Sequence, residues 1–192
     1  MKKVIIYGGA FNPPTKAHHA ILQALVDEAY KNDSEVWLVP SGERLDKTIG
    51  ISIDARIVLC KALMNGIRNN KVVLKLMTFE LLAETNTNTI ESARYLENKY
   101  PNHTFTWVFG SDSIETMSTW PGGKRLFSTL KMLVIARPYS QLDRLPPRAK
   151  LLKTKAITTS STEVRNRLKN GDTISHLTPK NVAILLESLS LY

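Results

Sequence analysis

The sequence predicts an α/β protein in which a doubly wound parallel sheet carries helices on both of its faces. Strand-like and helix-like segments alternate along the chain, an order typical of parallel sheets with helical crossovers. The length of 192 residues is enough for one substantial hydrophobic core. Two glycine-containing loops follow apolar, strand-like runs, as expected at the carboxyl ends of parallel strands.

The first half of the chain opens with an apolar run from Val4 to Tyr7, which ends at two glycines and predicts a strand over 3–7. A helix over 18–31 and a strand over 35–39, with the sequence EVWLV, follow it. Farther along we expect a helix over 53–66, a strand over 71–76 and a helix over 89–99.

The second half begins with the run TFTWVFG, which predicts a strand over 104–110 that ends in glycine. The remaining expected elements are short helices over 111–118 and 124–129, a strand over 131–136, a proline-containing surface loop over 138–150, a short strand over 155–157, and helices over 162–169 and 179–188. The last helix begins with Pro179, a residue that is favoured in the first helical turn.

We expect a single Rossmann-like domain over residues 1–192, because neither an internal repeat nor a long linker divides the chain. Residues 1–150 form the core sheet and helices, and residues 151–192 form a small C-terminal helical part. Ligands of such folds bind beyond the carboxyl ends of the strands, where the strand order reverses. The loops GGAFNPPTKAHH, after the first strand, and GSDS, after the strand over 104–110, are suited to that place.

The composition, with 43% hydrophobic and 22% charged residues, is that of an ordinary globular protein. No apolar run approaches the ~18 residues of a membrane span, and the single cysteine, Cys60, excludes a disulfide framework or a multi-cysteine zinc site. We therefore expect a cytoplasmic protein with no membrane partner and no protein-bound metal. The net charge of +9 suits phosphorylated small molecules as well as nucleic acid. Because the basic residues are scattered, no nucleic-acid partner is expected.

The first loop combines several features of a phosphate-binding turn. Gly8 and Gly9 allow a sharp turn and a close approach of the backbone to a ligand. The helix that begins near His18 presents unpaired amides and the positive end of its dipole. Thr15 and His18 are three residues apart and can reach one phosphate. The alternative is an ordinary strand-to-helix turn, since neither a Walker nor a GxGxxG spacing is present.

A second cluster of polar residues, ITTSSTEVRNRL, lies at 157–168. Ser160 and Glu163 have the spacing of a capping box that starts a helix. Ser161 and Thr162 add hydroxyls at the same helix start, and Arg165 lies one turn farther on. Together these side chains can hold two or three phosphate oxygens, with Arg165 supplying a guanidinium fork.

These motifs resemble signatures of a known family. The run GGAFNPPTKAH is similar to the GxFxPxHxGH signature of the nucleotidyltransferase superfamily, and most of all to the nicotinamide/nicotinate mononucleotide adenylyltransferases. Thr15 replaces the first histidine of the signature, as in eukaryotic members, and Ala17 replaces its glycine. The run at 157–168 resembles the ISSTxxR signature, and GSDSIETMSTW with the later ARP resembles the GxDxLxxxxxW…ARP segment of these adenylyltransferases.

The resemblance implies transfer of AMP from ATP to nicotinate or nicotinamide mononucleotide, a step of NAD biosynthesis, with Mg²⁺ bound through the substrate phosphates. It implies catalytic roles for His18, Thr15, Arg165 and Lys47. The ATP contacts that it implies are Gly8, Gly9, Ala10, Phe11, Gly110, Asp112, Ser113, Ser160, Ser161, Thr162 and Arg165. The mononucleotide contacts that it implies are Asn12, Thr89, Arg137 and Trp120, whose ring would stack on the pyridine.

Several alternatives stay open at this point. Trp120 can be a core residue, Thr89 an ordinary helix cap and Lys47 a solvated lysine. The protein can be a sister nucleotidyltransferase with another phosphorylated acceptor, which the segment around Trp120 argues against. It can also be a non-catalytic nucleotide- or nucleic-acid-binding protein of the same fold, which His18 and Arg165 argue against. The sequence leaves open the preference for the acid or the amide form of the pyridine, and homo-oligomer formation.

Overall fold

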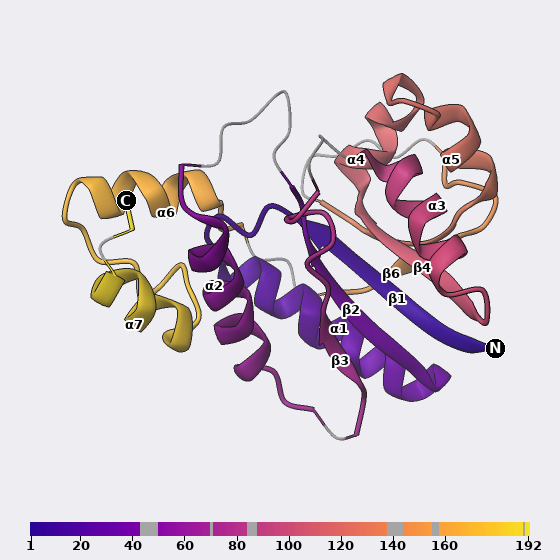
Figure 1. The fold of residues 1–192 in the computed structure, drawn as a ribbon. Helices are drawn as coiled ribbons and strands as arrows, with labels where there is room; N and C mark the ends of the chain where they lie inside the picture. Colours follow the sequence, from indigo (N-terminus) through magenta and orange to yellow (C-terminus); the bar gives the residue numbers. More distant parts are fainter. Residues whose placement is uncertain (43–49, 70, 84–87, 138–143, 155–157, 190) are drawn as a thin grey trace.

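The computed structural model describes residues 1–42, 50–69, 71–83, 88–137, 144–154, 158–189 and 191–192. In chain order its elements are β1 (Lys2–Gly9), α1 (Lys16–Asn32), β2 (Ser34–Pro40), α2 (Ile53–Asn65), β3 (Leu74–Leu76), α3 (Thr89–Lys99), β4 (His103–Gly110), α4 (Ser111–Thr116), the 3₁₀ helix η1 (Met117–Thr119), α5 (Gly123–Thr129), β5 (Lys131–Ile135), β6 (Ala149–Leu152), α6 (Ser161–Lys169) and α7 (Lys180–Leu189). Figure 1 shows their arrangement around one central sheet.

The six strands pair in the order β3-β2-β1-β4-β5-β6, and every pair is parallel. The register places Ile5 of β1 opposite Val36 of β2 on one side and Thr106 of β4 on the other. The chain builds outward from β1 in one direction and then, from β4, in the other. The predicted doubly wound α/β fold is confirmed, and the strand order reverses between β1 and β4.

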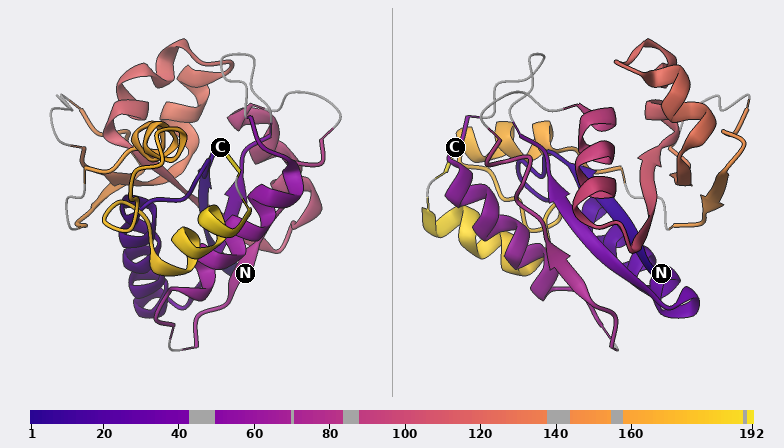
Figure 2. Two further views of the ribbon diagram at one scale, coloured as in Figure 1. Left: turned by 90° about the vertical axis from the view of Figure 1, so that its left-hand side faces the viewer. Right: turned by 45° about the vertical axis from the view of Figure 1, so that its right-hand side comes forward.

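Helices cover both faces of the sheet (Figures 1 and 2), and the alternation of side chains along β1 shows why. Ile5 and Tyr7 point into a core shared with α1, α2, α6 and α7, whereas Val4 and Ile6 point into a core shared with α3, α4 and α5. A strand that is buried on both faces must be apolar throughout, which explains the continuous hydrophobic run. No helix in the described part of the chain is long and apolar enough to cross a membrane.

The expected elements agree with the structure except near the C-terminal edge of the sheet. The expected strand over 155–157 lies outside the described residues. The sixth strand, β6, instead occupies Ala149–Leu152 and takes over the end of the segment expected to be a loop. This edge strand has a single neighbour, β5, and Leu151 is 55% exposed, so it lacks the hydrophobic pattern of a central strand. Pairing with β5 is what defines it.

The buried Cys60 and the half-buried Glu35 lie away from the site. Cys60 lies in the core face of α2, where burial raises the pKa of its thiol to about 12 and leaves it protonated.

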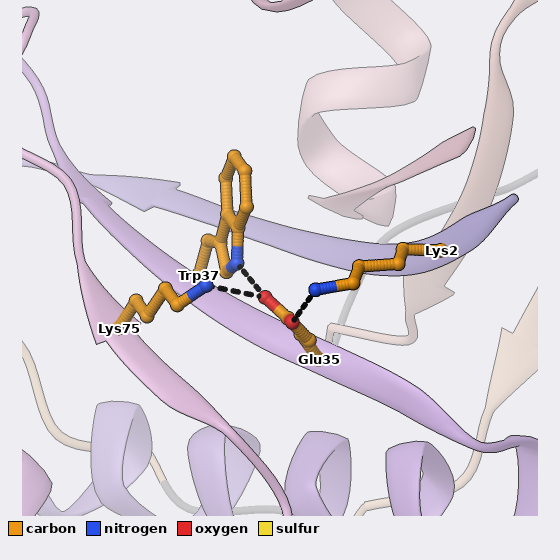
Figure 3. Close-up of polar contacts among 4 residues, drawn as sticks. All are labelled: Lys2, Glu35, Trp37 and Lys75. Atoms are coloured by element: carbon orange, nitrogen blue, oxygen red, sulfur yellow. Dashed lines mark hydrogen bonds and ion pairs between the residues drawn. The ribbon is translucent and has the colours of Figure 1, made fainter. Parts of the chain in front are cut away.

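Near the amino ends of the strands, Glu35 accepts hydrogen bonds from Trp37 Nε1 at 2.8 Å and Lys75 Nζ at 2.9 Å, and Lys2 Nζ lies 3.9 Å away (Figure 3). Burial alone raises the pKa of Glu35, but these hydrogen bonds outweigh it and hold the pKa below its ordinary value. The cluster joins β1, β2 and β3 at the end of the sheet opposite the candidate site.

Candidate active site

In the loop between β1 and α1, Gly9 leaves space for the ring of Phe11, which packs against the core. A Cβ atom on Gly9 would lie 3.1 Å from the ring of Phe11, so glycine gives that ring the space to fold back. Phe11 is 1% exposed and has a φ of 46°, an uncommon backbone conformation for a residue with a side chain. Its ring contacts Tyr7 and His18 edge to face, with centroids 5.3 and 5.2 Å away. Packing against the core thus determines the course of the loop.

Arg56 of α2 supports this loop through hydrogen bonds to backbone carbonyl oxygens. Its side chain is 2% exposed, and Nη2 donates to the carbonyl oxygens of Ala10, at 2.8 Å, and of Ser41. A buried guanidinium is tolerated where backbone carbonyls accept its protons. The sequence analysis did not single out Arg56. The available signal was a charged residue on the apolar face of the helix over 53–66, between Ala55 and Leu59.

Thr15 and His18 form a reciprocal cap at the start of α1. The Thr15 hydroxyl accepts from the His18 amide at 3.5 Å, and the Thr15 amide donates to His18 Nδ1 at 3.0 Å. The Thr15 hydroxyl also lies 2.9 Å from Nδ1. Because Nδ1 accepts a hydrogen bond from an amide, the ring proton of the neutral imidazole is on Nε2. His18 therefore offers an Nε2–H donor at the first turn of the helix.

The environment also keeps His18 uncharged. Burial and, to a smaller extent, the positive charge of Arg137 together lower the pKa of its imidazole from 6.5 to about 4. At neutral pH the ring is consequently neutral in the free protein. A neutral donor can form a hydrogen bond to a phosphate oxygen without having to change its protonation state first.

The structure gives Thr15 a role in orienting His18. Its side chain is fully buried, and its hydroxyl faces the His18 ring and amide. Burial at the helix start makes Thr15 the residue that orients His18, and the phosphate contact expected from the sequence stays a prediction. The spacing of three residues already held this signal, because it is the spacing of a capping box with histidine in the position of glutamate.

The second motif packs directly against the first loop. Ser160 is the N-cap of α6 and accepts from the Glu163 amide at 3.1 Å, as predicted. The Glu163 carboxylate lies 3.5 Å from Arg167, one turn farther on. Ser161 Oγ donates to the carbonyl oxygen of Pro13 at 2.8 Å, and Thr159 Oγ1 accepts from the Ala17 amide at 3.2 Å. The two motifs, which are distant in the sequence, therefore form one continuous surface.

Arg165 makes a long-range polar connection in this site. Its Nη1 donates to the carbonyl oxygen of Asn12, 153 residues earlier, at 2.8 Å, and its Nη2 donates to Thr162 Oγ1 at 3.2 Å. Asn12 was expected to bind the mononucleotide. That contact stays a prediction; in the structure Asn12 is 7% exposed, and its side-chain oxygen accepts from the hydroxyl of Tyr192. These contacts make Asn12 the junction between the loop and the C-terminal segment, and Tyr192 was not anticipated from the sequence.

The GSDS loop follows β4, the neighbour of β1, and so lies at the same edge of the sheet. Gly110 is the N-cap of α4, and a Cβ at this position would collide with the carboxylate of Asp112. Asp112 Oδ1 lies 3.6 Å from Arg137 Nε, and the Arg137 amide donates to the buried Ser111 hydroxyl at 2.9 Å. Both side chains of the ion pair are at least half exposed, so the pair contributes little to stability and remains open to a ligand. Arg137, just after β5, thus contacts the GSDS loop, and its positive charge also acts on the pKa of His18.

Two candidate mononucleotide contacts lie on the other face of the sheet. Trp120 is half-buried and meets Phe109 edge to face, with ring centroids 6.0 Å apart. A Cβ at Gly122 would run into the side chain of Ile90, so the segment after Trp120 packs against the start of α3. Thr89 is the first residue of α3, but the N-cap is Asn88. The expected alternative of Thr89 as a cap is therefore wrong.

Two other expectations concern Lys47 and a metal. Lys47 lies outside the described residues, so its expected role stays a prediction. Among the residues that the structure describes, no three side chains of His, Cys, Asp or Glu gather as a set of metal ligands. The site is instead lined by hydroxyls, backbone amides, arginines and one neutral histidine, groups that suit phosphate oxygens.

This donor set, at the reversal between β1 and β4, defines the class of a nucleotide-binding protein of the nucleotidyltransferase type. A family model described as cytidylyltransferase-like matches residues 6–167. A "Probable nicotinate-nucleotide adenylyltransferase" of Fusobacterium nucleatum is 30% identical, over 96% of this chain and 97% of the relative, and one of Halalkalibacterium halodurans is 29% identical, over 100% and 92%. The chain belongs to the cytidylyltransferase-like family and, within it, to the nicotinate-nucleotide adenylyltransferases. The family resemblance seen in the sequence is confirmed.

The fold is also similar to that of a solved structure. Plasmodium falciparum nicotinic acid mononucleotide adenylyltransferase, in its complex with NaAD, superposes with a TM-score of 0.82 at 23% identity. The match covers 100% of this chain and 98% of the other. At this level of identity the likeness supports the arrangement of the sheet and helices.

Proposed function

We propose that this protein transfers the adenylyl group of ATP to nicotinate mononucleotide, releasing pyrophosphate in a step of NAD biosynthesis. The observation that carries the proposal is the convergence of both phosphate motifs on His18, Ser161 and Arg165. The names of the curated relatives support the choice of reaction and of the acid form of the pyridine.

The reaction needs no nucleophile from the protein. An oxygen of the mononucleotide phosphate attacks the α-phosphorus of ATP and forms a new P–O bond. The bond between the α-phosphorus and the oxygen that bridges to the β-phosphorus breaks, and its electron pair leaves with pyrophosphate. Catalysis then comes from positioning the two substrates and from stabilising the charge on the transferred group.

His18 is placed to stabilise that charge. Its Nε2–H points away from the contacts at Nδ1 and donates to a non-bridging oxygen of the α-phosphate as negative charge develops there. Thr15 holds the ring in the required tautomer. Arg165 and the hydroxyls at the start of α6 bind the β- and γ-phosphates, and Mg²⁺ arrives with ATP as part of the substrate, keeping much of its water shell. Arg137, on the side of the GSDS loop, provides a positive charge that acts on His18.

The mononucleotide binds on the side of Trp120 and Thr89. Stacking of the Trp120 indole on the pyridine ring adds ~0.5–1.5 kcal/mol beyond the burial of area. Phe109 supports the indole from its edge, so the ring is held in place before the substrate arrives.

The test is pyrophosphate release from ATP and Mg²⁺, with nicotinate mononucleotide and nicotinamide mononucleotide offered separately and a control without acceptor. We expect release with nicotinate mononucleotide, slower release with the amide and none in the control. A second panel offers phosphopantetheine with ATP and choline phosphate with CTP. Activity on that panel, with both pyridine substrates inert, would assign the protein to a sister reaction of the same family.

A further inference from the structure

Tyr192 lies against the first phosphate loop although it is the last residue of the sequence. Figure 1 shows this end of the chain beside α6, at the end of the sheet far from the first residue. The ring of Tyr192 packs against the core that α1, α2 and α7 share. Its hydroxyl donates to the side-chain oxygen of Asn12. The ring therefore has a packing role, and the hydroxyl has a separate, polar one.

Asn12 makes two contacts at once. Its side-chain oxygen accepts from Tyr192, and its backbone carbonyl accepts from Arg165 Nη1 at 2.8 Å. Because Asn12 is 7% exposed, water has little access to either contact. The contact with Tyr192 holds the side chain of Asn12 and so helps to fix the direction of its backbone carbonyl. That carbonyl in turn holds the guanidinium of Arg165.

The surroundings keep the Tyr192 hydroxyl a donor. Burial raises the pKa of Tyr192, and the opposing effect of the Arg165 and Arg56 guanidinium groups is smaller. The phenol is therefore protonated throughout the neutral range. Both arginines that act on it also donate to carbonyls of the first loop, Arg165 to Asn12 and Arg56 to Ala10.

We propose that Tyr192 is a positioning residue for ATP binding, which acts by holding Asn12 so that Arg165 faces the β- and γ-phosphates. This inference rests on the proposed function, in which Arg165 binds those phosphates. The effect of Tyr192 is specific to ATP, because it acts through Arg165. The proposed mononucleotide contacts, Trp120 and Thr89, belong to other segments of the chain. A residue that only fills space would affect both substrates or the stability of the whole fold.

The test uses Tyr192→Phe, which keeps the ring and removes the hydroxyl alone. Loss of one neutral hydrogen bond predicts roughly fivefold weaker binding of α,β-methylene-ATP by calorimetry, and a similar rise in KM for ATP. The KM for nicotinate mononucleotide is expected to stay unchanged. The melting temperature should fall slightly, because the buried side-chain oxygen of Asn12 loses its donor. The matched control is Tyr30→Phe, because Tyr30 is 66% exposed on α1, and this variant should behave as wild type.

A double-mutant cycle identifies the route. In an Asn12→Ala background, Tyr192→Phe should cost no further affinity for the ATP analogue, because the acceptor is already gone. Additive effects would overturn the inference, as would equal losses for the two substrates or wild-type behaviour of Tyr192→Phe.

The binding arm also separates this inference from the proposed reaction. If the wild-type protein binds the ATP analogue but releases no pyrophosphate, the proposed reaction fails while the binding comparison still tests Tyr192. If the wild-type protein does not bind the analogue, Tyr192 has no ATP-positioning role and the inference is overturned.

Discussion

The imidazole of His18 has its Nδ1 engaged by the Thr15 amide at 3.0 Å and its pKa lowered to about 4 by burial and then by Arg137. At the scale of the single residue, a side chain that normally titrates near pH 6.5 thereby becomes a donor that is neutral at physiological pH. Neither fact requires a bound substrate. The free protein is therefore already organised to stabilise charge on a phosphate.

The protonation state of His18 can be observed directly. We expect ¹H–¹⁵N NMR to show a neutral ring with the proton on Nε2, from neutral pH down to about pH 5. Because the unfolded chain binds this proton near pH 6.5 and the folded chain near pH 4, the associated stability is present above pH 6.5 and is lost as the pH falls toward 4. The fall in melting temperature over that range should be smaller in His18→Asn. An imidazolium at pH 6 in the free protein would contradict the assignment.

The contribution of His18 to the rate of the reaction is a separate prediction. His18→Ala should lower kcat for pyrophosphate release by about 10²–10³-fold, the usual loss of one donor to a transition state, with little change in substrate binding. The control is His176→Ala, since His176 is exposed and outside the site. Turnover near that of the wild type in His18→Ala would remove this residue from its role.

At the scale of elements, helix starts and tight turns place the functional side chains. Thr15, Asn88 and Ser160 each cap a helix through a side-chain oxygen, and the sequence identified the cap at Ser160 correctly. The role of Thr15 was harder to predict, because a phosphate donor and a helix cap require the same residue type. The structure shows the cap, and the phosphate contact stays a prediction.

The turn before α5 offers a stability test away from the phosphates. A Cβ at Gly123 would collide with the backbone carbonyl of Met117, and a backbone atom cannot rotate away. We expect Gly123→Ala to lower the free energy of unfolding by about 2 kcal/mol, measured by urea denaturation. Gly50→Ala is the matched control, since no atom of the described residues lies within 4 Å of its Cβ position. Equal midpoints for the two variants would contradict this account of the turn.

At the scale of the whole molecule, a net charge of +9 meets two anionic substrates. The positive charge at the site includes Arg137, just after β5, and Arg165 of α6, whose side chain contacts the loop after β1. The fold thus brings cations from distant segments to one edge of the sheet. Isolated segments of the chain would carry the same charge without directing it to a nucleotide.

Substrate and metal should affect the molecule in distinguishable ways. MgATP at 100 times its Kd should stabilise the folded state by ~2.7 kcal/mol, seen as a higher melting temperature. EDTA should abolish pyrophosphate release but leave the melting temperature of the substrate-free protein unchanged, because Mg²⁺ enters with ATP. A lower melting temperature of the free protein in EDTA would instead indicate a metal bound by the protein itself.

The sequence by itself determined the α/β class, most of the elements and the family, and it located both motifs for which phosphate binding is predicted. These depend on local patterns: continuous apolar runs for the strands, capping residues at helix starts, and short runs of defined residue types. Only the tertiary structure decided that Thr15 orients His18, that Asn12 is a junction and that Arg56 and Tyr192 support the loop. The physical reason is that these roles come from burial and from hydrogen bonds across up to 180 residues of sequence, to which no local pattern corresponds. For the same reason β6, defined by pairing with β5, lay beyond what its own four residues could predict.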